Sequence, residues 1–498
     1  MAFLLGIDLG TSSAKAMLLE AGAGTVGVEA REYDVCSVRP GYAEQAPEVW
    51  WQAVCQALLS LRARFPAAFS EVRAVGLTGQ MHGLAAVDQN DRPVRPAIVW
   101  LDQRSGGQAQ EISRVMEEDV LARTLQNRVF PGFLLPSLLW VREQEPEVFE
   151  RIDCVLLPKD YIRLRLTGER ATDASDASAS LAFDVGRGAW AEELLRALGL
   201  DASLFPRVYP AGQIVGEVSA RAARETGLRT GTPVVCGAGD QPAQSIGNGL
   251  LEEGGVIANI GTGGQIAAFS TADRYDPLLR TQTFRHAVPG AFTIFGAALA
   301  SGLSLKWLKN EVFGGNMAYA ALDRLAQGAP AGSGGLLYLP YLSGERTPHM
   351  DPHARGAFFG LQLSHDRRFL TRAVMEGVVY SLRDSMEILK ELGLRAEYVI
   401  ASGGGARSAV WLQMQADIFE SPVRVCTEKE QACLGACLLA GVGAQVFADL
   451  GEACAAHVAF APEMYEPDAG RFALYREGYG RFRALYQNTR ALMRSCAL

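Results

Sequence analysis

A short motif occurs twice in this chain, half the chain apart, and it constrains the fold more than any other feature. Residues 6–13 read GIDLGTSS and residues 257–264 read IANIGTGG, so Thr11 and Thr262 occupy matching positions in the 498-residue sequence. An apolar run follows each copy, and each copy therefore predicts a strand, a tight Gly-Thr turn and a second strand. Two such hairpins predict two related lobes, each presenting one turn whose backbone amides can face phosphate.

Strand-like and helix-like segments alternate along the rest of the chain. Three buried-type strands end in loops rich in glycine or threonine, at residues 72–77, 233–236 and 398–401. Helical patterns cover residues 48–65, 367–392 and 407–419. This alternation predicts an α/β fold with largely parallel sheets. We expect the lobe boundary near residue 245, which gives lobes of residues 1–245 and 246–498.

Composition and charge exclude several classes of function. The chain has 47 Lys and Arg against 55 Asp and Glu, a net charge of −8, which argues against a nucleic-acid partner held by bulk charge. No apolar run is long enough to span a bilayer, and the N-terminus lacks a basic signal region, so we expect a cytoplasmic protein without a membrane partner. The nine cysteines contain no C-x-x-C pair, and Cys433 and Cys437 are interpreted as a small-residue packing face.

The first hairpin predicts a phosphate and metal site. Hydroxyls of Thr11 and Ser12 and the turn amides can bind phosphate oxygens, and Lys15 adds a cation. Asp8 would repel phosphate unless Mg²⁺ lies between them, so Asp8 is predicted to serve that metal. The second turn, with Gly261 and Thr262, carries Asn259 in the place of Asp8, which avoids a second repulsive carboxylate. The first hairpin alone leaves open that Asp8 only begins a turn.

Further polar residues follow other predicted strands. Asp240 follows the strand at 233–236 within Gly-Ala-Gly-Asp-Gln, a place that suits a base for phosphoryl transfer, although capping of the next helix explains it equally well locally. The segments at 80–83 and 100–104 supply amide, imidazole, indole and carboxylate groups, including His82, Trp100 and Asp102. This mixture suits a polyhydroxylated sugar, with ordinary structural roles as the alternative. Residues 402–408, SGGGARS, offer small residues against which a nucleoside can lie, or simply a tight turn.

Together and in this order, the segments resemble the FGGY family of carbohydrate kinases over nearly the whole chain. The most specific stretches are GQMHG at 79–83, LPKDY at 157–161, LPYLSGERTPH at 339–349, and residues 402–408. The resemblance implies two actin-like (ribonuclease H-like) ATPase lobes around a central cleft that takes MgATP and a sugar. Carried over by position, Asp240 is the catalytic base, and Asp8 serves the metal and phosphates. Sugar contacts come from Met81, His82 and Gln241, and the nucleotide path is lined by Thr11, Ser12, Thr262, Gly404 and Ser408.

Two positions depart from the family pattern. Members that act on xylulose usually have Asn at the position of Gln241, whereas members that phosphorylate glycerol have Gln there. The second turn reads Gly-Thr-Gly-Gly, where Gly-Thr-Ser-Gly is more usual. The expected reaction is transfer of the γ-phosphoryl group of ATP to a ketopentose, with D-xylulose as the first expectation. Ribulose, L-xylulose or a tetritol are alternatives, and an actin-like ATPase switch is the rival outside sugar kinases. The sequence allows a homodimer without indicating one.

Overall fold

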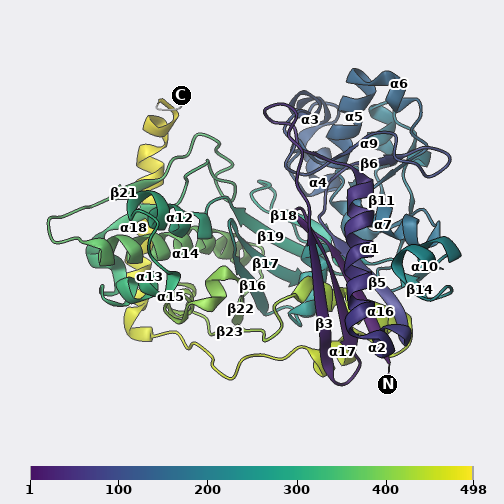
Figure 1. The fold of residues 1–498 in the computed structure, drawn as a ribbon. Coiled ribbons are helices and arrows are strands. Elements are labelled where there is room, and N and C mark those ends of the chain that lie inside the picture. The colour runs from purple at the N-terminus through teal and green to yellow at the C-terminus, as the bar shows by residue number, and fades with distance from the viewer. Residues whose placement is uncertain (1, 496–498) are drawn as a thin grey trace.

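The computed structural model describes residues 2–495 and contains two α/β lobes, each built around one large sheet (Figure 1). The first sheet has seven strands in the order β13-β14-β5-β1-β2-β3, with β15 also paired to β5. Its strands are β1 (Phe3–Leu9), β2 (Ser13–Glu20), β3 (Gly24–Glu32), β5 (Val72–Gly79), β13 (Ile214–Glu217), β14 (Pro233–Val235) and β15 (Ala238–Gly239). The second sheet has six strands in the order β18-β19-β17-β16-β22-β23. These are β16 (Gly255–Ile260), β17 (Gly264–Ser270), β18 (Gln282–Arg285), β19 (Phe292–Ala298), β22 (Tyr398–Gly403) and β23 (Val423–Val425).

The two sheets repeat one pairing pattern. In the first lobe β1 pairs antiparallel with β2, β2 with β3, and β1 runs parallel to β5. In the second, β16 pairs antiparallel with β17, β17 with β19, and β16 runs parallel to β22. The predicted α/β class and the two related lobes are confirmed. The sheets are mixed, however, because each Gly-Thr hairpin continues into a third antiparallel strand, so the expectation of largely parallel sheets was wrong.

Long helices cover these sheets, and their ends follow local sequence signals. The helix α1 (Pro47–Arg64) starts with proline, buries Trp50, Trp51 and Leu58, and lies against the first sheet. Asp366 caps α14 (Arg367–Glu391), whose buried residues join the second core with α13, α15 and α18. Those helices span Tyr319–Gln327, Ala409–Phe419 and Phe472–Ser495. Side-chain caps and proline in the first turn are common at helix N-termini, so these helix starts can be predicted from the sequence.

Smaller helices form a separate cluster over one end of the first sheet (Figure 1). It contains α3 (Gly106–Ile112), α4 (Glu118–Leu125), α5 (Leu134–Gln144), α6 (Pro146–Phe149) and α9 (Glu192–Ala197). The short hairpin of β10 (Phe183–Asp184) and β11 (Ala189–Trp190) lies beside it. Among the described residues, no helix combines the length and the apolar character that crossing a membrane requires.

The second half of the chain returns to the first lobe through α16 (Gln431–Gly443) and α17 (Leu450–His457). The helix α16 packs on β1 and β5 so closely that a Cβ on Gly76 would lie 1.9 Å from the Ala436 carbonyl oxygen. Its buried Cys433 and Cys437 form the small-residue packing face that the sequence predicts. The boundary near residue 245 therefore separates the two sheets, but the core of the first lobe is built from both halves of the chain.

Candidate active site

The first sheet brings two predicted acidic residues to one edge, on either side of β5. Asp8 on β1 lies opposite Thr78 of β5, and Gly239 on β15 lies opposite the next residue, Gly79. Asp240 follows directly as the first residue of α11 (Asp240–Gly247). Because β1 and β15 both run parallel to β5, the backbones of Asp8 and Asp240 are about two strand spacings, or about 10 Å, apart. Strand register therefore fixes this pair of carboxylates.

Burial changes the acid–base properties of both carboxyl groups. Burial, assisted by the charge of Asp8, raises the pKa of Asp240 to about 7. Burial also raises the pKa of Asp8 to about 6, although nearby Lys15 acts in the opposite direction. Among the described residues, no side chain donates a hydrogen bond to either carboxylate. A carboxylate whose pKa lies near neutrality and which lacks a side-chain donor can accept a proton from a substrate hydroxyl.

The two Gly-Thr turns occupy equivalent places in the two sheets. Asn259 on β16 corresponds in position to Asp8 on β1. Each residue has one neighbour on its hairpin partner strand and one on the adjacent parallel strand. Ser12 and Thr262 are exposed at the two tips, beside Gly261 in the second turn. The indole N–H of Trp100 donates to the Thr11 hydroxyl over 2.9 Å. Trp100 thus supports the first Gly-Thr turn.

Lys15 lies next to Asp8 in strand register and forms an ion pair with Glu430, just before α16. Both side chains keep about a third of their surface exposed, so solvent screens this pair. The Lys15 ammonium therefore stands beside the Asp8 carboxylate and is paired with Glu430. Sequence patterns gave no indication of this partner, which is 415 positions away.

Met81 and His82 lie next to the loop that carries Asp240. A Cβ on Gly239 would meet the Met81 sulfur at 2.9 Å, and Met81 belongs to an apolar cluster otherwise formed largely by second-lobe residues. His82 has a φ of 74°, and its Nδ1–H donates to the Ala179 carbonyl over 2.9 Å. Burial lowers the pKa of His82 to about 4, so the ring is neutral at pH 7 and Nε2 remains an acceptor for a hydroxyl.

Three residues beside His82 were not singled out from the sequence. Phe133 stacks on the imidazole at a centroid distance of 3.9 Å, and Phe284 of the second lobe lies at 5.6 Å. Arg346 lies over the Phe130 ring at 5.6 Å, and its guanidinium makes no ion pair with any described residue. Arg346 belongs to the LPYLSGERTPH stretch, which is the one signal that pointed to it. The aromatic residues lack any local signature, because apolar patterning predicts burial alone.

Asp102 and Gln241 differ in how free their side chains are. The Asp102 carboxylate is fully buried and accepts from the Ala43 amide at 2.6 Å and from the Arg104 guanidinium. Asp102 therefore holds its own loop, and its contact with a sugar hydroxyl stays a prediction. Gln241 lies in the first turn of α11 beside Asp240, and its amide has no partner among the described residues. Of the two, Gln241 keeps a free polar group.

The glycine-rich segment lies at the end of β22, next to the second turn. Ser402 and Gly403 pair with the last two residues of β16, so Gly404 stands beside the turn that holds Gly261 and Thr262. A Cβ on Gly404 would meet nothing closer than 3.7 Å, so this surface is open. The Ser408 hydroxyl caps α15 and donates to Asp323 on α13 over 2.8 Å. Sequence reasoning missed Asp323.

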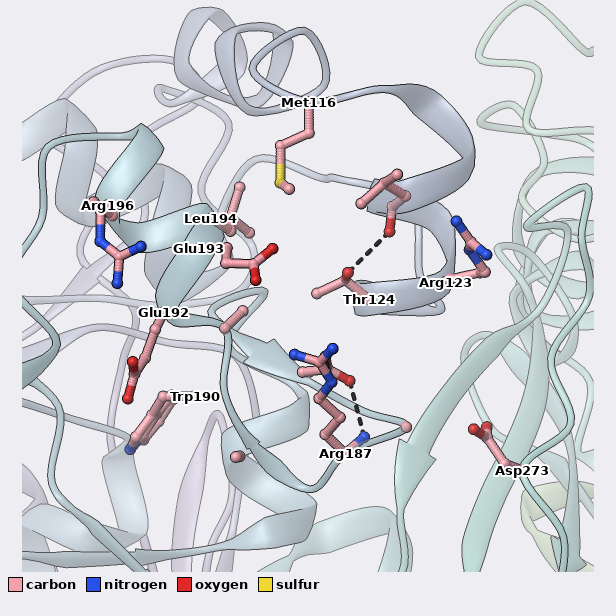
Figure 2. A pocket seen from close by; sticks show the side chains of 15 residues that line it. Met116, Arg123, Thr124, Arg187, Trp190, Glu192, Glu193, Leu194, Arg196 and Asp273 are labelled. Atoms are coloured by element: carbon pink, nitrogen blue, oxygen red, sulfur yellow. Dashed lines mark hydrogen bonds and ion pairs between the residues drawn. The ribbon is translucent and has the colours of Figure 1, made fainter.

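A cavity of about 720 Å³ lies away from these residues (Figure 2). It opens between α4, the β10–β11 hairpin and α9, with Asp273 of the second lobe at its side. Charged side chains of both signs line it, among them Arg187, Glu193 and Arg196. None of the predicted sugar, nucleotide or metal residues contributes to this cavity, so it is distinct from the candidate site.

Comparison with known proteins finds relatives that are similar in sequence and in fold over nearly the whole chain. Residues 3–247 match the N-terminal domain model of the FGGY family of carbohydrate kinases, and residues 256–444 match its C-terminal domain model. The chain is 37% identical to a xylulose kinase of Escherichia coli (strain K12), covering 98% of this chain and 99% of that protein. It is 35% identical to a xylulose kinase of Bacillus subtilis (strain 168), covering 99% and 98%. A crystal structure of a "xyloylose kinase" from Brucella ovis superimposes with a TM-score of 0.93 at 37% identity, covering 98% of this chain and all of that one.

Proposed function

Because the chain belongs to the FGGY family of carbohydrate kinases, we propose that it transfers the γ-phosphoryl group of ATP to the terminal hydroxyl of a ketopentose, D-xylulose in the first instance. The observation that carries this proposal is the placement of Asp240 across β5 from Asp8, next to Met81 and Gln241. One carboxylate then faces the sugar and the other faces the phosphates. The named activities of the relatives support the choice of xylulose.

In the proposed reaction Asp240 accepts the proton of the sugar hydroxyl as its oxygen bonds to the γ-phosphorus. The bond between that phosphorus and the bridging oxygen breaks, and ADP leaves with its electron pair. His82, through Nε2, and the Gln241 amide orient the sugar, with Met81 against its apolar side. The two Gly-Thr turns bind phosphate oxygens through backbone amides, which stabilises the charge that develops.

The residues at Asp8 fit a hard divalent cation. Its carboxylate is largely buried beside the phosphate turn, and no described side chain donates to it. Oxygen ligands with retained water are what Mg²⁺ prefers in phosphoryl-transfer sites. Asp8 would hold this ion, which when bound supplies positive charge to the phosphates. Asn259, its counterpart in the second lobe, adds no competing charge.

Nucleotide binding falls to the second lobe in this proposal. Gly404 leaves an open surface beside Thr262, and Ser408 with Asp323 forms a polar edge next to it. A nucleoside can lie along this surface with its phosphates pointing toward the two turns. Lys15 and Ser12 would meet those phosphates from the first lobe.

The test is a coupled assay of ADP release with a panel of D-xylulose, ribulose, L-xylulose, glycerol and erythritol. We expect D-xylulose to give the highest kcat/KM, and Asp240→Asn to lower its kcat about 10²–10⁴-fold, because loss of a positioned base has that effect. Asp201→Asn, a surface helix cap, is the matched control and should leave kcat unchanged. ATP turnover that ignores every sugar, or near-normal activity of Asp240→Asn, would refute the proposal.

A further inference from the structure

The backbone that carries Asp240 is held by a hydrogen bond from outside the sugar and nucleotide sites. The amide N–H of Gly239, one residue before Asp240, donates to the hydroxyl of Ser175 over 3.0 Å. Both residues are buried, and Ser175 has no exposed surface. Ser175 lies in α8 (Ala174–Ser178), a short helix that neither the sequence patterns nor the proposed reaction explains. The link therefore joins this helix to the loop of the base.

Ser175 is itself fixed by a chain of partners. Its hydroxyl donates to Asp173 Oδ2, and its amide donates to the same oxygen over 2.8 Å, which makes Asp173 the cap of α8. The other oxygen of Asp173 lies 2.9 Å from the ammonium of Lys159 on α7 (Pro158–Thr167). A continuous path thus runs from Lys159 through Asp173 and Ser175 to Gly239.

Lys159 is the centre of a fully buried charged cluster. Its ammonium also lies 2.7 Å from Asp160 and 3.0 Å from Asp176, and Arg163 is paired with Asp160 at 2.9 Å. Burial next to other carboxylates raises the pKa of Asp176 well above its ordinary value. Buried ion networks of this kind add little to stability compared with apolar packing. In this cluster Asp173 is held between Lys159 and Ser175.

The same short helix contacts the other parts of the site. The Ala179 carbonyl, just after α8, accepts from His82, and the Ser178 hydroxyl accepts from the amide of Arg285 over 3.0 Å. Arg285 is the last residue of β18 in the second lobe. Hydrogen bonds thus connect the α8 segment with Gly239 before Asp240, with His82 and with the second lobe.

We propose that Ser175, held by Asp173 and Lys159, is a positioning residue that sets the orientation of Asp240 for proton transfer. This inference rests on the proposed role of Asp240 as the base. Removing the Ser175 hydroxyl leaves the Gly239 amide buried without an acceptor, and the loop then moves to find another partner. A displacement of about 1 Å at the reacting atoms costs up to about 10²-fold in rate.

The test compares Ser175→Ala with Ser245→Ala, a buried serine on α11 whose hydroxyl bonds only the Leu250 carbonyl. We expect Ser175→Ala to lower kcat about 10–100-fold while KM for sugar and ATP stays within about threefold, because binding groups are untouched. Ser245→Ala should lower the melting temperature without changing kcat. A purely structural role for Ser175 predicts the same pattern as the control, and this result would overturn the proposal.

Adding Ser175→Ala to Asp240→Asn separates the two proposals. If Ser175 acts through Asp240, the second change alters the residual rate by less than about twofold, since coupled residues are not additive. A further tenfold loss overturns the inference. Activity in Asp240→Asn alone refutes the base assignment, whereas an inactive Asp240→Asn with a fully active Ser175→Ala removes only the positioning role. Should Ser175→Ala not fold, Ser175→Cys replaces the hydroxyl by a slightly larger thiol that accepts hydrogen bonds only weakly, and unchanged kcat in that variant likewise overturns the positioning role.

Discussion

Substitution of Gly435 by alanine tests whether α16 fixes the position of α11, the helix that begins at Asp240. Gly435 lies in the middle of α16, and its Cβ would be 2.0 Å from the carbonyl oxygen of Ala243 on α11. Ordinary contact begins at 3.4 Å, so the helices must separate by about 1.4 Å, the difference between the two distances. Both partners are main-chain atoms of regular helices and have no side-chain rotation with which to avoid the overlap.

Two opposing effects set the size of the change. Alanine in a helix interior is about 1 kcal/mol more favourable than glycine. Overpacking of a tight core contact typically costs about 1–3 kcal/mol, and a backbone partner favours the upper end. The net expectation is a loss of about 2 kcal/mol, or about 4–8 °C in melting temperature at about 2–4 °C per kcal/mol for a unit the size of one lobe. Because Ala243 lies three residues after Asp240, kcat should also fall, by up to about 10²-fold.

Gly480→Ala on α18 is the matched control, since a Cβ there meets nothing within 4 Å. It gains the same helix propensity without the overlap, so its melting temperature should rise by about 2–4 °C and its kcat should not change. The two variants are compared by thermal melting and by steady-state phosphorylation of D-xylulose well below both transitions. If Gly435→Ala melts like Gly480→Ala and keeps full kcat, the reasoning from close packing is refuted.

Two further predictions concern the acidic residues of the first lobe. Burial and then the charge of Asp8 raise the pKa of Asp240 to about 7, so its carboxylate form is lost as the pH falls through that value. The kcat/KM for sugar should therefore drop about tenfold per pH unit below about pH 6, and a flat pH profile from 5.5 to 8 would contradict this assignment. Asp102→Asn leaves the buried Arg104 with Glu44 as its remaining charge partner and should destabilise the protein by about 1–3 kcal/mol in urea unfolding. Asp366→Asn, which changes an exposed ion pair, should alter stability by less than about 1 kcal/mol. An altered sugar preference in Asp102→Asn would support Asp102 as a sugar contact.

Much of the site was predictable because its residues follow strands. The hairpins around Thr11 and Thr262 have local signatures, and Asp240 follows a recognisable strand and a glycine loop. Parallel strands end at the same edge, so strand order alone brings Asp8 and Asp240 together. The family resemblance then gave roles that agree with these positions, and the family comparisons confirm that resemblance.

Other features could not be predicted because they depend on what a side chain meets after folding. Asp102 looked like a free loop carboxylate, but Arg104 and the Ala43 amide occupy its oxygens. Trp100 was predicted to cover a sugar, which stays a prediction, and the hydrogen bond from its indole N–H to the Thr11 hydroxyl was not indicated by the sequence. Composition and spacing show which groups are near in sequence. They do not indicate which donor and acceptor pair in the folded protein.

The sequence by itself determined the local elements of this protein, the paired lobes and the carboxylates at the strand ends. These features depend on apolar periodicity and turn residues within short segments. Only the tertiary structure decided that α16 closes the first lobe, that Lys159 gathers Asp160, Asp173 and Asp176, and that Ser175 meets Gly239. Each of these contacts lies in the interior and joins elements whose local sequences do not indicate one another. Close packing and the need to pair every buried charge select them, and both act on the assembled chain.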